Sequence, residues 1–334
     1  MLTMLLCGDV MLGRSFNRLF GTDPNFNIWG STLDLITKCD FFGINLETTI
    51  TNHTIKFPNK TFNFRLGTRY KNVLNNVSYA NLANNHSLDF MEAGLTDTME
   101  NLNSLNIAFS GAGKTLSDAM KAAIININGT KIGIVSASDH PKNFAAGKEN
   151  PGINFVDIDD LDRWKDYITS ITAVRSKVDI LIYSMHHGSN YVDAIPQNTI
   201  NFFRNLVDSG VDIIHGHSAH HVLPIEKYKN GYIFYAMGDF IDDYAVDPFY
   251  RNDLSFLAEI KISDKKIKSV DIHPTKITIG YNNGNGVLVP QVNLIDKRDP
   301  DYDFVVEHIM YNKYKKKYRK YKHKYLFLKN NSFL

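Results

Sequence analysis

The sequence predicts a layered α/β sandwich with two mixed sheets, and three observations lead to this fold class. Short apolar runs alternate with amphipathic segments along the first part of the chain, which is the pattern of strands joined by helices. Two Asn-Gly dipeptides, Asn128-Gly129 and Asn230-Gly231, lie between short apolar runs and indicate β-hairpins. Polar residues suited to ligand binding (Asp, Asn, Glu or His) follow five separate strands, so we expect them to meet at one sheet edge.

The individual elements are assigned from periodicity and from flanking residues. Strands are predicted at residues 2–7, 41–46, 77–83, 122–127, 131–136, 178–184, 211–215, 225–228, 232–236, 254–260 and 267–272, and helices at 33–38, 70–76, 91–105, 161–174 and 196–207. Pro196 suits the first turn of its helix, where a backbone N–H has no partner to lose. The glycine-rich stretch 111–115 lacks the spacing of a phosphate loop, so it predicts no phosphate site.

The composition is that of an ordinary globular protein with enough length for a large core. The chain has 334 residues, of which 43% are hydrophobic and 22% charged. Residues 1–9 have no basic segment and no long apolar run, so we interpret them as a first strand rather than a signal peptide. No run is long enough to span a bilayer. We expect a cytoplasmic protein, and contact with the inner face of the membrane is left open.

Two cysteines, Cys7 and Cys39, are too few for a disulfide framework. Both lie beside predicted strands, where a small buried thiol is the usual arrangement. The cysteines therefore predict neither a disulfide scaffold nor a reactive site.

The ends of the first two strands carry residues that suit a binding site. Asp9 follows the first strand beside a glycine, where open sheets bind ligands, although an aspartate there can equally cap a helix. Asn45 and Glu47 end the second strand, and alternate residues of an extended segment share a face. These two side chains can therefore point to one place, or they can simply form a polar strand end.

The end of the third strand gives a stronger signal. Asn84, Asn85 and His86 lie together at a strand-to-helix turn. Amide oxygens suit a hard cation, and an imidazole can ligate a metal or transfer a proton. Ser87 or Asp89 is expected to cap the helix that follows.

Histidines are concentrated in the second half of the chain. Half of the 12 histidines fall between His186 and His221, most of them in a loop after a short apolar run. A strand that ends in a histidine-dense turn is a common way to hold a metal, so we prefer this interpretation to ordinary surface histidines. Asp139 and His140 are weaker candidates for substrate contact, and His273 is expected to be structural.

The C-terminal tail has its own pattern. Tyr311, Tyr314, Tyr318, Tyr321 and Tyr325 recur at spacings of three and four, which predicts one face of a helix. Eight basic residues and no acid lie in residues 313–324, whereas the net charge of the whole chain is only +2. Such a helix can pack its tyrosines on the body of the protein. It can also act as a reversible anchor to anionic lipid or to an acidic polymer.

Six short stretches together resemble the CapA or poly-γ-glutamate biosynthesis (PGA-cap) family, which is related to the calcineurin-like metallophosphoesterases. They are Gly8-Asp9-Val10-Met11-Leu12-Gly13-Arg14, Asn45-Leu46-Glu47, Asn84-Asn85-His86, His186-His187-Gly188, Gly216-His217-Ser218-Ala219-His220 and Tyr235-Ala236-Met237-Gly238-Asp239-Phe240. The stretches occur in the family's order and cover roughly residues 1–245, so the match is specific.

The resemblance implies a four-layer α/β/β/α sandwich of the calcineurin-like metallophosphoesterase type, with a metal site at the strand ends. The metal ligands that it implies are Asp9, Asn45 or Glu47, Asn85, His186, His217 and His220. His86 is implied as a catalytic proton donor, with Arg14 supplying positive charge. Asn84, Asn190 and Asp239 are implied as substrate contacts. The cofactor would be one or two divalent transition metal ions (Mn, Fe or Zn).

Three positions depart from the pattern of these families. Met11 stands where phosphoesterases usually carry a histidine, which the capsule family also lacks. Asn190 replaces the glutamate that is usual in the family, and Asp239 replaces the usual asparagine. The charge of the implied site therefore differs from that of its relatives.

Two functions are consistent with this resemblance. The first is a metal-dependent hydrolase acting on a phosphoester or a γ-glutamyl or glycan-type bond in the metabolism of capsule, poly-γ-glutamate or another envelope polymer. The second is a non-catalytic accessory protein that binds the polymer or its synthase. The expected partners are an anionic polymer or a phosphorylated small molecule, with membrane or synthase contact through the tail. We do not expect a nucleic-acid partner. Residues 1–285 are predicted as the main domain and residues 286–334 as a C-terminal extension.

Overall fold

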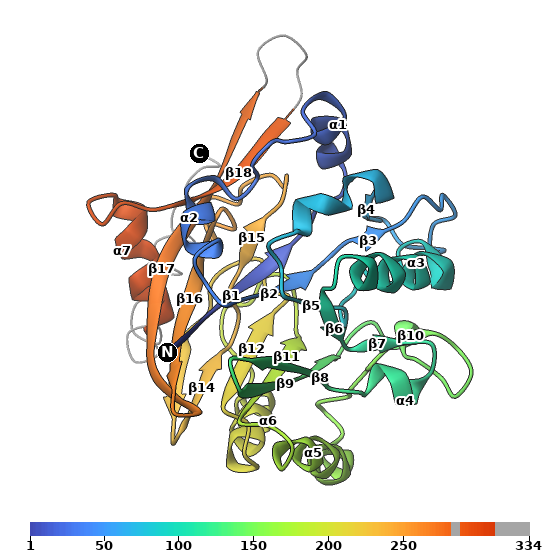
Figure 1. The fold of residues 1–334 in the computed structure, drawn as a ribbon, viewed down its shortest axis with the longest axis vertical. Helices are drawn as coiled ribbons and strands as arrows, with labels where there is room; N and C mark the ends of the chain where they lie inside the picture. Colours follow the sequence, from blue (N-terminus) through green and yellow to red (C-terminus); the bar gives the residue numbers. More distant parts are fainter. Residues whose placement is uncertain (282–287, 311–334) are drawn as a thin grey trace, which may run out of the picture.

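A computed structural model describes residues 1–281 and 288–310, and its two main sheets pack face to face (Figure 1). The first sheet has eight strands in the order β18-β17-β16-β1-β2-β5-β6, with β15 paired to the end of β1. They are β1 (Leu2–Val10), β2 (Phe41–Leu46), β5 (Tyr79–Asn81), β6 (Ala108–Ser110), β15 (Asp239–Ile241), β16 (Leu254–Ser263), β17 (Lys266–Tyr281) and β18 (Leu288–Leu294). Strands β1, β2, β5 and β6 run parallel, and β16, β17 and β18 continue the sheet antiparallel.

The second sheet has six strands in the order β13-β14-β12-β11-β9-β8. They are β8 (Ala123–Ile127), β9 (Thr130–Ser138), β11 (Ile180–His186), β12 (Ile213–His217), β13 (Ile225–Tyr228) and β14 (Gly231–Phe234). The four inner strands are parallel, and a hairpin forms each edge. Two small sheets pair β3 (Thr49–Ile50) with β4 (Arg65–Leu66) and β7 (Ala112–Gly113) with β10 (Gly152–Ile153).

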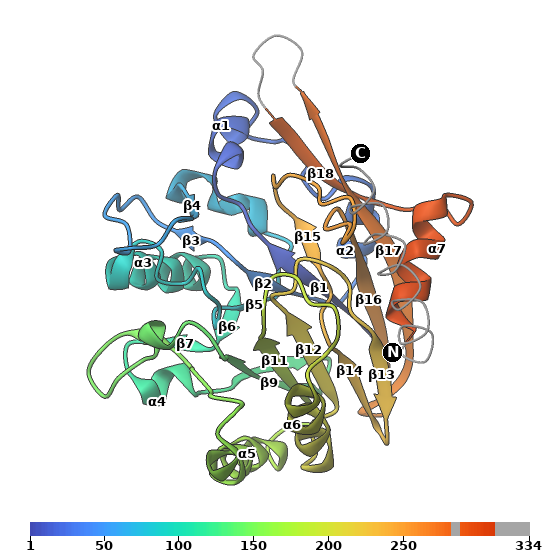
Figure 2. The same ribbon diagram turned by 180° about the vertical axis from the view of Figure 1, so that it is seen from behind.

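The described helices lie on the outer sides of the two sheets and at the edge of the first (Figures 1 and 2). The α-helices are α1 (Ser15–Thr22), α2 (Leu33–Ile36), α3 (Met91–Ser104), α4 (Leu116–Ala119), α5 (Leu161–Arg175), α6 (Gln197–Asp208) and α7 (Pro300–Ile309). Short 3-10 helices occur at η1 (Gly30–Thr32), η2 (Thr68–Leu74) and η3 (Lys142–Phe144).

The order of the layers follows from the alternation of side chains along the strands. In β1, Met4 and Leu6 enter the core between the sheets, where they meet residues such as Ile182 of β11. Leu5 and Cys7 point the other way, into the core beneath α1, α2 and α3. Both faces of β1 are therefore buried, which explains its nearly continuous apolar sequence.

The second sheet is buried on both faces in the same way. Ile180 and Ile182 of β11 face the first sheet, whereas Leu181 and Tyr183 pack beneath α5 and α6 with side chains such as Phe202. The layers are therefore helices, sheet, sheet and helices. This arrangement confirms the predicted four-layer α/β/β/α sandwich.

Most predicted elements are present, with several corrections. The hairpin at Asn128-Gly129 is confirmed, since both residues have positive φ (51° and 82°), as a tight hairpin turn requires. The helix predicted at residues 70–76 is the 3-10 helix η2, and the strand predicted at 77–83 shortens to β5. Helix α1 was not predicted. The predicted cap of α3 by Ser87 or Asp89 is wrong, because its N-cap residue is Phe90, without a side-chain hydrogen bond.

The first part of the predicted C-terminal extension is continuous with the sandwich. Strand β18 pairs with β17, and Val305 and Ile309 of α7 are buried in the core between the sheets. The predicted tyrosine-striped helix lies outside the described residues. Cys7 is fully buried as expected, whereas Cys39 is only partly buried.

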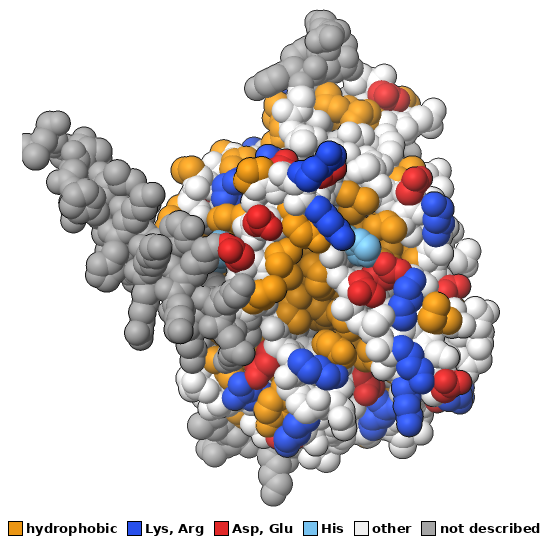
Figure 3. All heavy atoms as spheres, turned by 90° about the vertical axis from the view of Figure 1, so that its left-hand side faces the viewer, with side chains coloured by type: hydrophobic (Ala, Val, Ile, Leu, Met, Phe, Trp, Pro, Cys, Tyr) orange, Lys and Arg blue, Asp and Glu red, His pale blue; other side chains and the backbone are white. Residues whose placement is uncertain are grey.

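The surface that carries β17 and α7 has hydrophobic side chains in its centre and charges of both signs around them (Figure 3). The visible part of this face therefore does not present one sign of charge to a partner. Among the described residues, no helix is both long and apolar enough to cross a membrane.

Candidate metal centre

Strand ends from both sheets deliver acidic and imidazole side chains to one buried place. Asp9 near the end of β1 is in register with Asn45 of β2 and with Asp239 of β15. In the other sheet, His186 of β11 is in register with His217 of β12. Because these parallel strands end at the same edge of the sandwich, residues far apart in sequence become neighbours.

Asp9, His186 and His217 form the first candidate metal-binding group, with one ligand atom from each lying within 4.8 Å of the others. The Nδ1 atoms of the two imidazoles are 3.0 Å apart, and His217 Nδ1 is 4.0 Å from Asp9 Oδ1. All three residues are buried. Two nitrogen atoms and a carboxylate oxygen form a donor set that suits Zn²⁺, Fe or Mn²⁺.

Asp9 also belongs to a second group, with His220 and Asp239. His220 Nδ1 lies 2.7 Å from Asp239 Oδ1. The other carboxylate oxygen of Asp239 is buried without a hydrogen-bond partner, as is Nε2 of His186. Unpaired buried polar atoms are rare in native proteins. Each candidate metal group holds one of them, although others, such as Thr275 Oγ1, lie elsewhere. Asp9 lies between the two groups, as a shared ligand would.

The local backbone supports this arrangement. Gly216 lies between His215 and His217 at the end of β12. A Cβ atom at this position would lie 2.3 Å from the carbonyl oxygen of Tyr235. Only a glycine at this position allows β12 to lie so close to the backbone of Tyr235. Ser218 has a φ of 102°, which is uncommon for a residue other than glycine, and its N–H donates to Asp9 Oδ2 over 3.2 Å. The strained turn thus helps to orient the shared carboxylate.

The carboxylates of the site are difficult to ionise without a cation. Burial raises the pKa of Asp9 to about 6, although a hydrogen bond from Asn45 opposes the rise. Burial raises the pKa of Glu47 and of Asp239 well above their usual ranges, and the charge of Asp9 adds to both effects. A divalent cation would offset this repulsion and favour the ionised forms.

The imidazoles show the complementary behaviour. Burial lowers the pKa of His186 and His217 well below the usual range, and neighbouring histidines add to the effect. Burial also lowers the pKa of His220. Neutral imidazoles are the forms that bind metals, so these histidines are suited to ligation near neutral pH.

Asn45 is oriented to support Asp9 rather than to coordinate a metal through its oxygen. Its amide nitrogen donates to Asp9 Oδ1 over 2.7 Å, while its oxygen accepts from Asn81 and Asn84. Both of those amides are themselves fixed by backbone groups, since Asn81 contacts Ala83 and Asn84 contacts the carbonyl of Leu46.

Asn84 also accepts from the backbone N–H of His86 and is fully buried. Its contacts favour a role in shaping the turn over the predicted contact with substrate. Asn85 differs, because its side-chain oxygen is buried without a hydrogen-bond partner and its side chain lines the adjoining pocket. That free oxygen is consistent with the predicted ligand role.

His86 lies in a second cluster beside the metal groups. Asp89 Oδ2 is 2.7 Å from His86 Nδ1, and Lys60 Nζ lies 2.6 Å from the other oxygen of Asp89. Lys60 is also 3.0 Å from His86 Nδ1, and the ring of Phe64 stacks on the imidazole at 4.2 Å between centroids. The short contact to Asp89 favours a proton on Nδ1 and leaves Nε2 as the free nitrogen.

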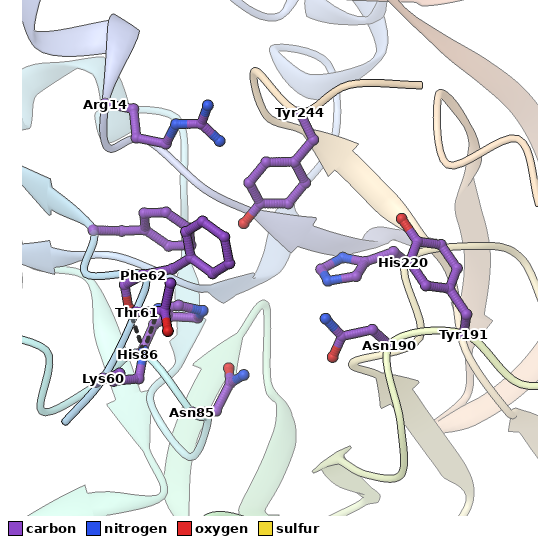
Figure 4. Close-up of a pocket in the computed structure, with 11 residues that line it drawn as sticks. Arg14, Lys60, Thr61, Phe62, Asn85, His86, Asn190, Tyr191, His220 and Tyr244 are labelled. Atoms are coloured by element: carbon purple, nitrogen blue, oxygen red, sulfur yellow. Dashed lines mark hydrogen bonds between the residues drawn. The ribbon is translucent and has the colours of Figure 1, made fainter. Parts of the chain in front are cut away.

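A pocket of about 360 Å³ opens beside these groups (Figure 4). Its lining residues are Arg14, Lys60, Thr61, Phe62, Phe64, Asn85, His86, Asn190, Tyr191, His220 and Tyr244. Figure 4 shows Arg14 and Tyr244 on the upper side, with His86 and His220 facing the cavity from opposite sides. Arg14 lines the pocket and is half-exposed, and its Nε lies 3.3 Å from Asp243, so the cation at this edge is paired with an acid. Its role in supplying positive charge to the site stays a prediction.

The three departures from the family pattern have different structural consequences. Met11 is buried in the core beneath the helices of the first sheet, and therefore does not take part in either metal group. The Asn190 side chain lines the pocket, as expected of a substrate contact. Asp239, predicted as a substrate contact, also supplies an oxygen to the second metal group.

Several residues of the site were not predicted from sequence. Lys60 lies in an irregular segment, and Asp242, which is buried beside Asp239, follows the last family stretch. Tyr244 lines the pocket, and burial raises its pKa well above the usual range. The run Asp242-Asp243 was a signal that could have been used, whereas nothing around Lys60 distinguishes it from a surface lysine.

Four other histidines, two from the dense segment and two from elsewhere in the chain, have contacts of their own. Nε2 of His187 lies 2.7 Å from the carbonyl oxygen of Tyr235, and Nε2 of His221 accepts from the N–H of Val192. The ring of His140 lies 5.1 Å from that of His186, so this weaker candidate is close to the metal groups. His273 contacts Glu259 over 2.7 Å, in keeping with a structural role.

Comparison with known proteins gives a consistent family. Residues 3–244 match the family described as bacterial capsule synthesis protein PGA_cap. A probable polyglutamine synthesis accessory protein of Mycobacterium tuberculosis (strain CDC 1551 / Oshkosh) is 33% identical over 283 residues, covering 72% of this chain and 74% of the relative. The PGA biosynthesis protein CapA of Bacillus subtilis (strain 168) is 29% identical over 241 residues, covering 71% of this chain and 62% of the relative.

Among solved structures, the chain is similar to a 5'-nucleotidase precursor from Thermus thermophilus. The TM-score is 0.45 at 13% identity, and the alignment covers 82% of this chain and 54% of the nucleotidase.

Proposed function

The chain belongs to the bacterial capsule synthesis protein PGA_cap family, and on that premise we propose that it is a metal-dependent hydrolase of capsule or envelope polymer metabolism. The bond it cleaves would be a phosphoester or a γ-glutamyl or glycan-type bond. The observation that carries this proposal is the convergence of Asp9 with His186 and His217 in one buried group.

The chemistry of the residues fits a divalent transition metal. Asp9, His186 and His217 would hold one ion, and Asp9 with His220 and Asp239 offers a place for another. When bound, such an ion supplies Lewis acidity, which lowers the pKa of a water molecule and polarises a phosphoryl or carbonyl oxygen. Glu47 Oε1 lies 3.3 Å from Nε2 of His186 without a hydrogen bond between them, so a carboxylate stands beside this ring.

His86 is the group best suited to move a proton toward a leaving group. Asp89 holds its Nδ1 side, and His86 lines the pocket that a substrate would enter. Burial lowers the pKa of His86, so the neutral ring is the resting form. An anionic substrate beside the ring would favour the charged form, which is the one that can donate. Arg14 and Lys60 at the pocket would attract such a substrate.

The accessory role remains the second candidate, and the name of the mycobacterial relative favours it. In this role the same pocket would bind part of an anionic polymer or contact a synthase, without cleaving a bond. The expected location at the inner face of a membrane is likewise a proposal, and it depends on the tail rather than on the described residues.

Hydrolysis assays on the purified full chain distinguish the two roles. The protein is loaded with Mn²⁺, Fe²⁺ or Zn²⁺ and offered a chromogenic phosphoester, a γ-glutamyl anilide and an aryl glycoside, with and without a chelator. Turnover that chelator removes and metal restores would support the hydrolase. A matched variant, His273→Ala, should keep this activity because His273 lies outside both metal groups.

Metal-loaded protein that cleaves none of the substrates, but binds poly-γ-glutamate in a sedimentation assay, would instead support the accessory role. Activity that is unaffected by chelator would contradict the metal-dependent mechanism.

A further inference from the structure

A chain of buried hydrogen bonds runs from the backbone of the first sheet to the metal groups. Nε2 of His215 lies 2.7 Å from the carbonyl oxygen of Cys7. Nδ1 of His215 lies 3.0 Å from the hydroxyl of Ser184, which in turn lies 3.0 Å from Nε2 of His217. All four residues are fully buried or almost so.

The direction of these hydrogen bonds follows from their first member. A carbonyl oxygen can only accept, so Nε2 of His215 must carry a proton. The ring of His215 is buried, and the partners of its two nitrogens are a carbonyl oxygen and a hydroxyl rather than a carboxylate, so a second proton would place an unpaired charge in the core and the ring is neutral. A neutral imidazole with a proton on Nε2 has a bare Nδ1, and this atom accepts the hydroxyl proton of Ser184.

The protonation of His217 follows from the same hydrogen bonds. Since the Ser184 hydroxyl gives its proton to His215, its oxygen is left to accept from Nε2 of His217. Nδ1 of His217 is therefore bare, and this is the atom that faces His186 Nδ1 and Asp9.

We propose that Ser184 and His215 are positioning residues that fix the tautomer of His217 and make Nδ1 its metal-binding nitrogen. This inference rests on the proposed metal centre and adds two residues that do not belong to either candidate metal group. Without the Ser184 hydroxyl, the ring of His217 can carry its proton on Nδ1, where His186 and Asp9 would accept it. A proton held there competes with the metal.

The chain offers a matched control for Ser184. Ser136 on β9 is the register partner of Ser184 on β11, and it is equally buried. Its hydroxyl contacts the hydroxyls of Tyr79 and Ser110, and none of the described histidines. Ser136→Ala therefore removes a buried hydroxyl from the same layer of the sheet without changing the contacts of His217.

The test uses full-length protein in three variants, Ser184→Ala, Ser184→Thr and Ser136→Ala, beside the unchanged chain. Zinc affinity is measured by competition with a chelating dye. Ring nitrogen signals of ¹⁵N-histidine-labelled, metal-free protein report the tautomer, with His217→Gln used to assign the signals. Thermal unfolding confirms that each variant is folded.

Ser184→Ala should bind zinc about 10- to 100-fold more weakly, which is the usual effect of losing a partner of a metal-ligating histidine. Ser184→Thr should restore most of the affinity if it folds, and Ser136→Ala should match the unchanged chain. In the metal-free protein, His217 should carry its proton on Nε2.

Equal zinc affinity in Ser184→Ala and Ser136→Ala would overturn the proposal, and so would a proton on Nδ1 of His217 in the unchanged chain. The tautomer measurement needs no metal and holds even if Ser184→Ala fails to fold. Failure of the proposed function is distinguishable from failure of this inference. A chain that binds zinc but cleaves no substrate still tests Ser184 through its zinc affinity. In a chain that binds no zinc, the tautomer of His217 alone decides the inference.

Discussion

Replacement of Asp89 by asparagine should destabilise the protein by about 2–4 kcal/mol. The carboxylate of Asp89 is fully buried and has three partners, namely Lys60 Nζ at 2.6 Å, His86 Nδ1 at 2.7 Å and the N–H of Phe64 at 2.6 Å. Removing one member of a buried ion pair costs roughly 3–5 kcal/mol. Two features reduce the expected loss of stability below this general range. Lys60 keeps 19% of its side chain exposed, and the new amide can still accept one hydrogen bond.

Thermal unfolding followed by circular dichroism measures this effect, which corresponds to a midpoint lower by about 3–6 °C. Asp118→Asn is the matched control, because the Lys121–Asp118 pair has a similar length of 2.7 Å but is exposed. Its midpoint should stay unchanged. Metal content should be equal in both variants, since Asp89 belongs to neither metal group. Equal midpoints for the two variants would refute the view that Asp89 anchors His86 and Lys60.

Three further predictions concern catalysis, pH and the tail. His86→Asn should keep its metal but lower the turnover of a metal-dependent substrate by about 10²–10⁴-fold, and loss of metal would instead make His86 a ligand. Zinc affinity should fall between pH 7 and pH 5, because burial raises the pKa of Asp9 to about 6 and the protonated acid cannot bind the metal. A zinc affinity that is constant or higher at pH 5 would contradict this prediction. Binding to anionic liposomes should be stronger for the full chain than for a chain ending at Met310, and should weaken with salt, whereas equal binding would reject an anchoring tail.

The shortened chain ends at Met310 because helix α7, which precedes the tail, is part of the folded body. The basic tail begins after residue 310, but α7 directly precedes it and buries Val305 completely. Removal of residues after 300 would therefore also expose part of the core between the sheets.

The meeting of Asp9, His186 and His217 could be predicted from the sequence because these residues follow strands with clear patterns. Asp9, His186 and His217 each stand at the end of an apolar run, and parallel strands place such ends at a common edge. Their meeting could therefore be expected from the order of residues alone.

Other features depend on contacts that local patterns do not encode. The amide of Asn45 turns its nitrogen toward Asp9 only because Asn81 and Asn84 occupy its oxygen. Lys60 reaches His86 from the segment between β3 and β4, which has no periodicity. Asp89 looked like a helix cap because aspartate is a good cap, but its carboxylate is used by three other groups.

Metal content is the most direct test of the central claim that Asp9, His186 and His217 form a metal site. Purified full-length protein, its His186→Ala/His217→Ala double variant and the control His273→Ala are analysed by elemental mass spectrometry after exposure to Mn²⁺, Fe²⁺ and Zn²⁺. We expect at least about one transition metal ion per chain in the unchanged and control proteins, and loss of most of it in the double variant. Full metal content in a folded double variant would contradict the site.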